Sequence, residues 1–304
     1  MKAMPFTPRS FGVWNLRSQS LALGKRTLVM GVLNTTPDSF SDGGGFITHA
    51  SAIEHALAMF GEGADIVDVG GESTRPGKHE PLSIPEEIDR VVPVLEGVLR
   101  HRPESILSVD TYKAETAAAA LRAGAEIVND VSGLLWDRAM APVCAAAGCG
   151  VVLMHTRGRP EEWHALPAMD PRQVVPQVKQ ELAERLQAAL EAGIGRERIV
   201  LDPGFGFGKA YDRNYSLLAG LAELSSLGHP LLVGVSRKRF LGRTLAPLYQ
   251  GVDVPVEGRG NASLAAVTAA ILAGAAVVRV HNVRSTREAA AVADAVLEAA
   301  EANA

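Results

Sequence analysis

Eight short apolar runs recur along this chain of 304 residues, and helical patterns separate most of them. Runs that are apolar throughout indicate parallel strands buried on both faces. After the first run, Ile53, Ala56 and Phe60 follow the i, i+3, i+7 spacing of an amphipathic helix. Because no change of composition marks a domain boundary, this alternation favours a single-domain α/β protein with a closed (β/α)8 barrel over an open doubly wound sheet. The predicted strands lie at roughly 28–33, 65–69, 105–109, 125–128, 150–154, 198–201, 231–235 and 276–280.

The segment before the first run has a pattern of its own. Val13, Leu16 and Leu21 are apolar residues within 11–24, a length that suits a small hairpin at the bottom of the barrel. We therefore predict an N-terminal extension over residues 1–24 and the barrel over 25–304.

Charge and hydropathy exclude several classes of protein. The net charge is −4, and no basic block is longer than Arg237-Lys-Arg239, so we expect no nucleic-acid partner. The weakly polar stretch 264–278 is too short to span a membrane, and residues 1–11 lack the apolar core of a secretory signal. We predict a cytoplasmic protein with no membrane partner, in which Cys144 and Cys149 are reduced and packed.

Polar residues follow the predicted strands at the end where barrels keep their active sites. Each has a plainer interpretation, since Asp110 can cap the next helix and Asn129 with Asp130 can form a turn. As a set they favour a pocket whose carboxylate and carboxamide groups bind a planar heterocycle with N–H groups. Met154 and Phe207 are either apolar contacts in this pocket or core residues. The set comprises Asn34, Asp68, Asp110, Asn129, His155, Asp202, Ser236, Arg279 and His281.

Two polar, glycine-bearing loops also begin where predicted strands end, at Asn34–Gly44 and Gly70–Gly77. Arg75, with Arg279 and His281, can bind an anion such as phosphate or pyrophosphate. Asn34, Ser73 and Thr74 can add neutral hydrogen bonds. For Arg279 and His281 the alternative is an ion pair with a carboxylate of a neighbouring strand. The sequence contains no nucleophile elbow, P-loop, zinc signature or dinucleotide-binding glycine pattern.

These motifs resemble those of the bacterial dihydropteroate synthase family, the folate-pathway enzymes that sulfonamides inhibit. The matching blocks run in order along almost the whole chain. They are Met30-Gly-Val-Leu-Asn-Thr-Thr-Pro-Asp-Ser-Phe-Ser-Asp-Gly-Gly44, Asp68-Val-Gly-Gly-Glu-Ser-Thr-Arg-Pro-Gly77, Ser108-Val-Asp-Thr111, Asn129-Asp130, Leu153-Met-His155, Leu201-Asp-Pro-Gly-Phe-Gly-Phe-Gly-Lys209, Gly234-Val-Ser-Arg-Lys238 and Arg279-Val-His281.

The resemblance implies a transferase that condenses 6-hydroxymethyl-7,8-dihydropterin pyrophosphate with 4-aminobenzoate, giving 7,8-dihydropteroate and pyrophosphate. It implies small-molecule substrates, Mg²⁺ as cofactor and a homodimer. The implied pterin ligands are Asp110, Asn129, Met154, Asp202, Phe207, Lys238 and Arg279. Those for pyrophosphate are Asn34, Thr74, Arg75, Arg279 and His281, with Asn34 also reaching the metal. Those for 4-aminobenzoate are Phe40, Thr74, Pro76, Phe207, Lys238 and Arg239. The implied catalytic residues are Asp38, Arg75, Asp110, Lys238, Arg279 and His281.

The chemistry suits a site without a strong nucleophile or base. If the C–O bond to pyrophosphate breaks first, in an SN1-like reaction, the protein must position the substrates and stabilise a cation, for which Asp110 is our candidate. The two loops would then exclude water, with Gly43–Gly45 as a hinge. Arg239 departs from the family pattern, because many relatives carry serine there; the carboxylate of 4-aminobenzoate then meets either this arginine or backbone N–H groups.

Two other functions share part of this pattern. A pterin-binding methyltransferase has the same Asp/Asn/Asp set but no need of a pyrophosphate subsite, so Arg75 and its loop argue against it. A pterin-binding paralogue without turnover is the second alternative, and the intact Asp110, Lys238 and Arg279 argue against that.

Overall fold

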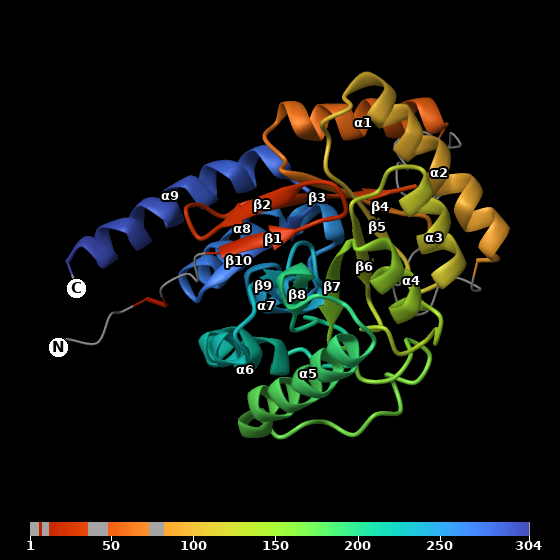
Figure 1. The fold of residues 1–304 in the computed structure, drawn as a ribbon. Coiled ribbons are helices and arrows are strands. Elements are labelled where there is room, and N and C mark those ends of the chain that lie inside the picture. Colours follow the sequence, from red (N-terminus) through yellow and green to blue (C-terminus); the bar gives the residue numbers. More distant parts are fainter. Residues whose placement is uncertain (1–5, 8–11, 36–47, 73–81, 304) are drawn as a thin grey trace.

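A computed structural model of the chain describes residues 6–7, 12–35, 48–72 and 82–303, and its central feature is a closed parallel barrel (Figure 1). Strand β10 pairs with β3 and closes the ring, with Val278 opposite Val29. The predicted fold class is confirmed, and each predicted run overlaps a barrel strand. The barrel strands are β3 (Leu28–Asn34), β4 (Ile66–Gly70), β5 (Leu107–Asp110), β6 (Ile127–Asp130), β7 (Gly150–Met154), β8 (Ile199–Asp202), β9 (Leu231–Val233) and β10 (Ala275–Val280).

Helices cover the outside of the barrel, as the alternating pattern predicted (Figure 1). The second helix follows Ser83, which forms a capping box with Glu86. The last helix begins at Val283, where the Asn282 side chain accepts a hydrogen bond from the Ser285 N–H at 3.1 Å and caps the helix. The α-helices are α1 (His49–Gly61), α2 (Ile84–His101), α3 (Ala114–Arg122), α4 (Met140–Ala147), α5 (Val174–Glu191), α6 (Arg213–Ala219), α7 (Arg239–Leu245), α8 (Gly260–Leu272) and α9 (Val283–Ala302).

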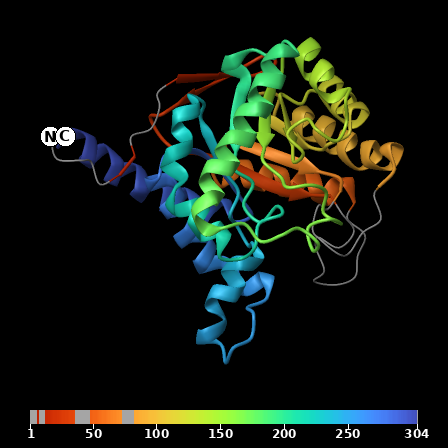
Figure 2. The same ribbon diagram turned by 90° about the horizontal axis from the view of Figure 1, so that it is seen from below.

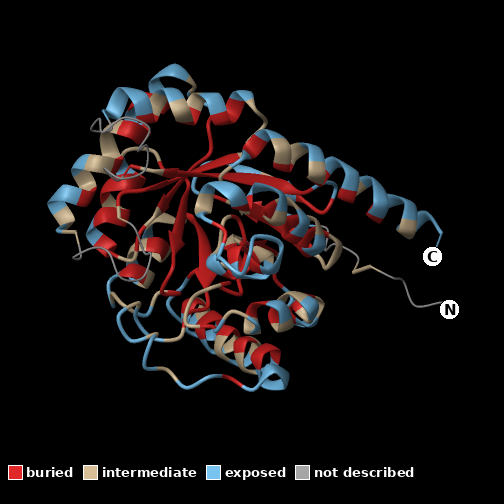
Figure 3. Cartoon of the chain, turned by 180° about the vertical axis from the view of Figure 1, so that it is seen from behind, coloured by how far each residue is buried: buried red, intermediate tan, exposed pale blue. Residues whose placement is uncertain are grey.

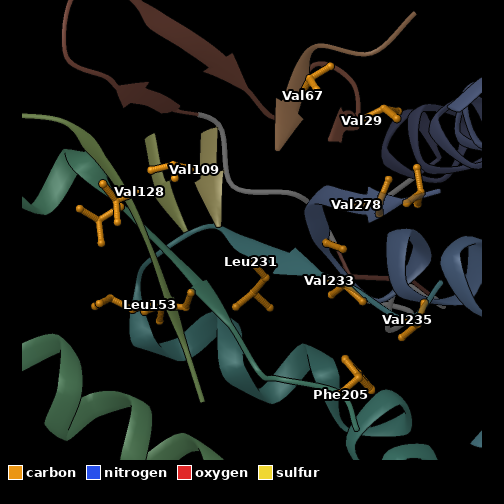
Figure 4. Close-up of a cluster of buried hydrophobic side chains, with 14 of the residues drawn as sticks. Val29, Val67, Val109, Val128, Leu153, Phe205, Leu231, Val233, Val235 and Val278 are labelled. Carbon is orange, nitrogen blue, oxygen red and sulfur yellow. The ribbon is translucent and has the colours of Figure 1, made fainter. Parts of the chain in front are cut away.

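Alternate residues of each strand face opposite sides of the barrel wall. Figure 3 shows the barrel strands as buried and the outer sides of the helices as largely exposed. One set of strand residues, which includes Val29, Val67 and Val109, packs with the helices in the larger apolar cluster (Figure 4). The other set faces the barrel interior, where Met30, Ile66 and other residues form a separate apolar cluster. This alternation decides which residue at the end of each strand reaches the barrel mouth.

A hairpin lies against the lower end of the barrel interior. Its antiparallel strands are β1 (Gly12–Asn15) and β2 (Ser20–Leu23). Trp14 is fully buried in the interior cluster, and its Nε1 donates to the carbonyl oxygen of Arg198 at 2.9 Å. Ser18, in the turn, donates from both its N–H and its hydroxyl to the buried Glu126 carboxylate, at 2.7 and 2.5 Å. The hairpin therefore covers the end of the barrel opposite the mouth.

The structure also shows the state of the cysteines, the character of the helices and one exposed apolar segment. Cys144 and Cys149 are buried and free, as predicted. Within the described ranges, no helix has the length and apolar character needed to cross a bilayer. The segment from α7 to the start of α8 projects from the body of the protein in Figure 2, and Leu248 and Val252 on it are exposed.

Candidate active site

The interior-facing residues change from apolar to polar near the carboxyl ends of the strands. Ile66 is followed two residues later by Asp68, and Ile127 by Asn129, on the same interior side. Asp68, Asn129 and Asp202 are all buried. The barrel mouth thus collects polar groups from strands that are far apart in the sequence, as predicted.

Arg279, at the end of β10, links two carboxylates across this mouth. Its Nε donates to Asp68 Oδ2 at 2.6 Å, and its Nη2 donates to Asp110 Oδ2 at 2.6 Å. Burial disfavours its charge, but Asp68 and Asp110 more than offset this and raise its pKa. Arg279 therefore forms the ion pair that was the alternative prediction. Its carboxylate partners belong to β4 and β5, which do not adjoin β10. Nη1 carries further N–H donors, so the pair leaves the guanidinium able to bind a ligand.

Asp110 lies in an unusual electrostatic environment. Burial, opposed by Arg279 and reinforced by the nearby Asp68, raises its pKa to about 7. Asp110 does not cap the following helix, because the Ala114 N–H donates to Asp137 Oδ2 at 2.8 Å instead. Asp110 is therefore available to a ligand, and a positive charge placed beside it would stabilise its ionised form.

Asn129 has its amide orientation fixed by a neighbour. Its Nδ2 donates to Asp68 Oδ2 at 2.9 Å, the same oxygen that accepts from Arg279. The amide oxygen is then the group that can accept an N–H of a ligand. Asp68 Oδ1 is buried and has no hydrogen-bond partner among the described residues. Asp68, predicted only as a member of the polar ring, thus orients both Arg279 and Asn129.

Asp202 completes the carboxylate set from β8. Burial raises its pKa, while the Gly204 N–H, which donates to Oδ1 at 2.7 Å, and the charge of Lys238 oppose that change. Gly234 leaves space beside it, since a Cβ there would lie 3.9 Å from Asp202 Oδ2 and 3.8 Å from the Arg279 Cβ. A flat ligand can therefore approach this floor closely.

Lys238 and Phe207 form a second group at the rim. The Lys238 Nζ lies 4.1 Å from the centre of the Phe207 ring, in cation–π geometry. The Lys238 side chain also lies over Gly206, where a Cβ would be 3.4 Å from its Cδ. The structure thus brings together both residues that were predicted to contact pterin and 4-aminobenzoate.

The remaining predicted ligand contacts among the described residues are Met154, Asn34, His281 and Arg239. Met154 is buried at the end of β7, and Asn34 is partly buried at the end of β3. His281 Nδ1 lies 3.1 Å from the Ser236 hydroxyl oxygen. Arg239 is 73 % exposed, with its guanidinium carbon 5.3 Å from the centre of the Tyr211 ring.

Two polar residues of the predicted ring or its neighbourhood point away from the mouth. His155 follows the inward-facing Met154, so alternation turns it toward α5, where its Nε2 lies 3.0 Å from Glu181 Oε2. Burial lowers the pKa of His155 to about 3, and the imidazole is neutral at neutral pH. Asp130 likewise faces outward and accepts from the N–H groups of Ser132 and Leu134, which is the turn chemistry anticipated for the Asn129-Asp130 pair. The two members of that pair thus have different roles.

Six predicted site residues lie outside the described residues: Asp38, Phe40, Ser73, Thr74, Arg75 and Pro76. The proposed hinge, Gly43–Gly45, lies outside them too.

The residues that flank segment 73–81 are held by one buried cation. Lys113 Nζ is 2.5 Å from Glu72 Oε2, 3.0 Å from Glu87 Oε2 and 2.6 Å from the Leu82 carbonyl oxygen. This lysine thus joins residues on both sides of the segment. The role of Lys113 was not predicted from the sequence, because a lysine at the start of a helix usually lies in solvent.

Comparisons with known proteins agree with this geometry. The family model of pterin-binding enzymes matches residues 30–281. The dihydropteroate synthases of Bacillus subtilis (42 % identity, 94 % of both chains) and Escherichia coli (44 %, 90 % of this chain and 93 % of that one) are similar in sequence. A Xanthomonas albilineans dihydropteroate synthase structure with 4-aminobenzoic acid superposes with a TM-score of 0.84 at 41 % identity, over 94 % of this chain and 98 % of that one. A Yersinia pestis dihydropteroate synthase structure in a sulfonamide drug complex gives 0.85 at 40 %, over 95 % and 100 %.

The matched region contains every strand-end residue of the mouth, and the likeness extends over nearly the full length of these relatives. The chain belongs to the pterin-binding enzymes and, within them, to the dihydropteroate synthase family.

Proposed function

We propose that the barrel mouth condenses 6-hydroxymethyl-7,8-dihydropterin pyrophosphate with 4-aminobenzoate to 7,8-dihydropteroate and pyrophosphate, as a transferase of folate biosynthesis. The observation that carries the proposal is the buried array in which Arg279 joins Asp68 and Asp110 while Asn129 shares the same Asp68 oxygen. An array rich in acceptors suits a flat heterocycle rich in N–H donors.

The pterin is proposed to lie on the floor beside Gly234. Asp202 and the Asn129 amide oxygen would accept its amino and ring N–H groups, and Met154 would contact its face. Lys238, against Phe207, would donate to a pterin acceptor. Placing these groups in a rigid barrel fixes the exocyclic carbon in one position for attack.

Asp110 is proposed to stabilise the cation formed when the exocyclic C–O bond breaks. The bonding electrons leave on the bridging oxygen of pyrophosphate, and the positive charge spreads over the dihydropterin. The arylamine nitrogen then forms the C–N bond and releases a proton. An arylamine is neutral at neutral pH, so this attack needs no dedicated base. A buried carboxylate beside the developing charge interacts with it more strongly than one in water does.

The pyrophosphate is proposed to lie between Asn34, His281 and the free edge of Arg279, with Thr74 and Arg75 added from their loop. Asn34 offers a hard carboxamide oxygen of the kind Mg²⁺ accepts. Within the described part of the chain, no group of three or more His, Cys, Asp or Glu residues could hold a metal ion. The Asn34 oxygen would hold Mg²⁺ together with pyrophosphate oxygens and water as the other ligands. The bound ion would neutralise charge on the leaving group.

The 4-aminobenzoate is proposed to pack against Phe207 and Lys238, with Phe40 and Pro76 as further walls. Its carboxylate would meet the first turn of α7, where Arg239 stands. Because the Arg239 guanidinium lies over Tyr211, the backbone N–H groups are the version we favour. An Arg239→Ala variant should then keep its KM for 4-aminobenzoate within about twofold; a rise of tenfold or more would favour the side chain.

A homodimer remains a proposal, supported by the exposed apolar Leu248 and Val252 on the projecting segment. Sedimentation of the purified chain tests it.

The reaction is tested by supplying dihydropterin pyrophosphate, Mg²⁺ and 4-aminobenzoate and measuring dihydropteroate and pyrophosphate. We expect one pyrophosphate per dihydropteroate, and a slower formation of both products in Asp110→Asn. Tight pterin binding without product would instead indicate a pterin-binding protein that does not turn over.

The order of bond breaking has its own test. With ¹⁸O in the bridging oxygen, C–O cleavage before attack should scramble the label into the neighbouring non-bridging positions of recovered substrate when 4-aminobenzoate is withheld. Retention of the label in its original position over many turnover times would contradict the stepwise reaction.

A further inference from the structure

Phe207 contacts two different partners. One is Lys238, whose Nζ lies 4.1 Å from the ring centre. The other is Trp163, whose ring centre is 5.4 Å away with an interplanar angle of 86°. Edge-to-face contacts of this kind favour one orientation of both rings. Trp163 comes from the segment between β7 and α5, and it is not among the residues to which the family resemblance assigns a role.

The segment that carries Trp163 is itself fixed to the loop after β8. The Arg157 guanidinium donates from Nη1 to the carbonyl oxygens of Pro167, at 3.1 Å, and Gly208, at 3.0 Å. Trp163 Nε1 donates to the Gly158 carbonyl oxygen at 3.3 Å. At Gly208 the two segments approach so closely that a Cβ would lie 2.8 Å from the Arg157 carbonyl oxygen and 3.2 Å from Trp163 Cδ1. The indole therefore has a defined position rather than a loose surface contact.

The backbone and ring of Phe207 are held by different residues. Lys209 is buried, and its Nζ donates to the carbonyl oxygens of Gly204, at 2.7 Å, and Phe207, at 3.2 Å. The backbone of the loop is thereby fixed independently of Trp163. What Trp163 adds is a limit on where the Phe207 ring can turn.

Space for such a turn lies next to the indole. A hollow of about 180 Å³ is lined by Trp163, Leu166, Ala168 and Gly206, among others. Removing the indole would extend this hollow to the Phe207 ring. The Phe207 ring would then have room to rotate away from Lys238 into the enlarged hollow.

We propose that Trp163 is a positioning residue for the arylamine: it keeps the Phe207 ring against Lys238 and so shapes the wall on which a 4-carboxyaniline packs. The inference rests on the proposed function. It assigns to the β7–α5 segment a part in recognising the second substrate but none in breaking the C–O bond.

Trp163→Ala tests this through separate kinetic constants. Loss of an edge-to-face pair is worth a factor of about 2 to 12, so we expect KM for 4-aminobenzoate to rise by about that factor. The kcat and the calorimetric affinity for 6-hydroxymethylpterin should stay within about twofold. Trp163→Phe should restore most of the KM. A purely structural role would lower the folded fraction and thus the apparent kcat, and would leave KM unchanged.

Two controls decide whether Trp163 acts through Phe207. Trp136 forms a similar edge-to-face pair, with Tyr112 at 5.1 Å, and its ring also lies 5.1 Å from the guanidinium carbon of Arg159 in the β7–α5 segment. Trp136→Ala therefore removes a matched ring contact, and a contact of the same segment, other than the one with Phe207, and it should leave this KM unchanged. In a Phe207→Leu background, Trp163→Ala should have no further effect on KM.

The inference is overturned if wild-type protein makes dihydropteroate while Trp163→Ala keeps the wild-type KM for 4-aminobenzoate. It is also overturned if Trp136→Ala raises this KM as much as Trp163→Ala does, or if the effects of Trp163→Ala and Phe207→Leu on this KM simply add. Absence of dihydropteroate with wild-type protein would instead refute the proposed function and this inference with it.

Discussion

The two ends of the barrel interior are built from the same strands yet from opposite chemistry. At the lower end, Ile66 and Ile127 belong to one apolar cluster with Trp14 of the hairpin. Two residues further along the same strands stand Asp68 and Asn129. One inward-facing step along each strand thus separates a core that stabilises the fold from a polar array that costs free energy to bury.

The upper end tolerates this cost because its groups partner one another. Asp68 and Asp110 share Arg279, and Asn129 donates to Asp68. Even so, the pKa of Asp110 near 7 indicates that ionisation is incompletely compensated in the free protein. We therefore expect residues at the lower end to determine the stability of the fold and residues at the upper end to determine reactivity. Substitutions at each end can test this division.

Trp14→Ala should have the largest effect. It removes a fully buried side chain and its hydrogen bond to the Arg198 carbonyl oxygen, so we expect the free energy of unfolding to fall by about 3–5 kcal/mol. Urea unfolding followed by circular dichroism measures this. A loss under about 1 kcal/mol would mean that the hairpin is not part of the core.

Arg279→Met should have the next largest effect, on activity. It removes the cation between Asp68 and Asp110 and the donor that we propose for pyrophosphate, so we expect kcat/KM to fall on the order of 10²–10³. Steady-state rates corrected for the folded fraction measure it. Arg279→Lys is the matched control, which keeps the charge but loses the two-carboxylate geometry and should recover only part of the rate. Full recovery with lysine would contradict the geometric role.

Asp110→Asn should reduce kcat/KM by about 10–100-fold at pH 8 and less at lower pH. The pKa of Asp110 is about 7, so in the free enzyme this group is mostly ionised above pH 7 and mostly protonated below it. The wild-type advantage should therefore shrink as pH falls through that value. The measurement is the ratio of wild-type to variant kcat/KM from pH 5.5 to 8.5, which cancels substrate ionisation. A ratio that is constant with pH would rule out the ionised carboxylate as the active form.

Ser18→Ala should have the smallest effect. It deletes the hydroxyl that donates to the buried Glu126 but leaves the Ser18 N–H bond to the same carboxylate. We expect a loss of about 1 kcal/mol in the free energy of unfolding, with unchanged activity. A change in KM for either substrate would show that the lower end communicates with the mouth.

The sequence allowed the barrel and most of the mouth to be predicted, because buried parallel strands are continuous apolar runs and their ends are marked by polar residues. His155 shows where that reasoning was incomplete. A strand's end can be located from its apolar run, but which terminal residue faces inward depends on an alternation that shifts with one residue of register. The same alternation separates Asn129, which faces the mouth, from Asp130, which forms a turn.

The contacts between distant segments could not be predicted. The Lys113 contacts with Glu72 and Glu87 and the Trp163 contact with Phe207 join loops that are neighbours only in the folded barrel. Arg279 was predicted to bind ligand, and its carboxylate partners depend on the curvature that brings β4 and β5 within its reach.

The most direct test is the rate of dihydropteroate formation per folded molecule, measured for Arg279→Met and Trp14→Ala beside the wild type at a temperature where all three are folded. We predict a fall on the order of 10²–10³ for Arg279→Met and a rate within about twofold of wild type for Trp14→Ala. Equal falls in both variants, or a wild-type rate in Arg279→Met, would contradict the division between a stabilising lower end and a reactive upper end.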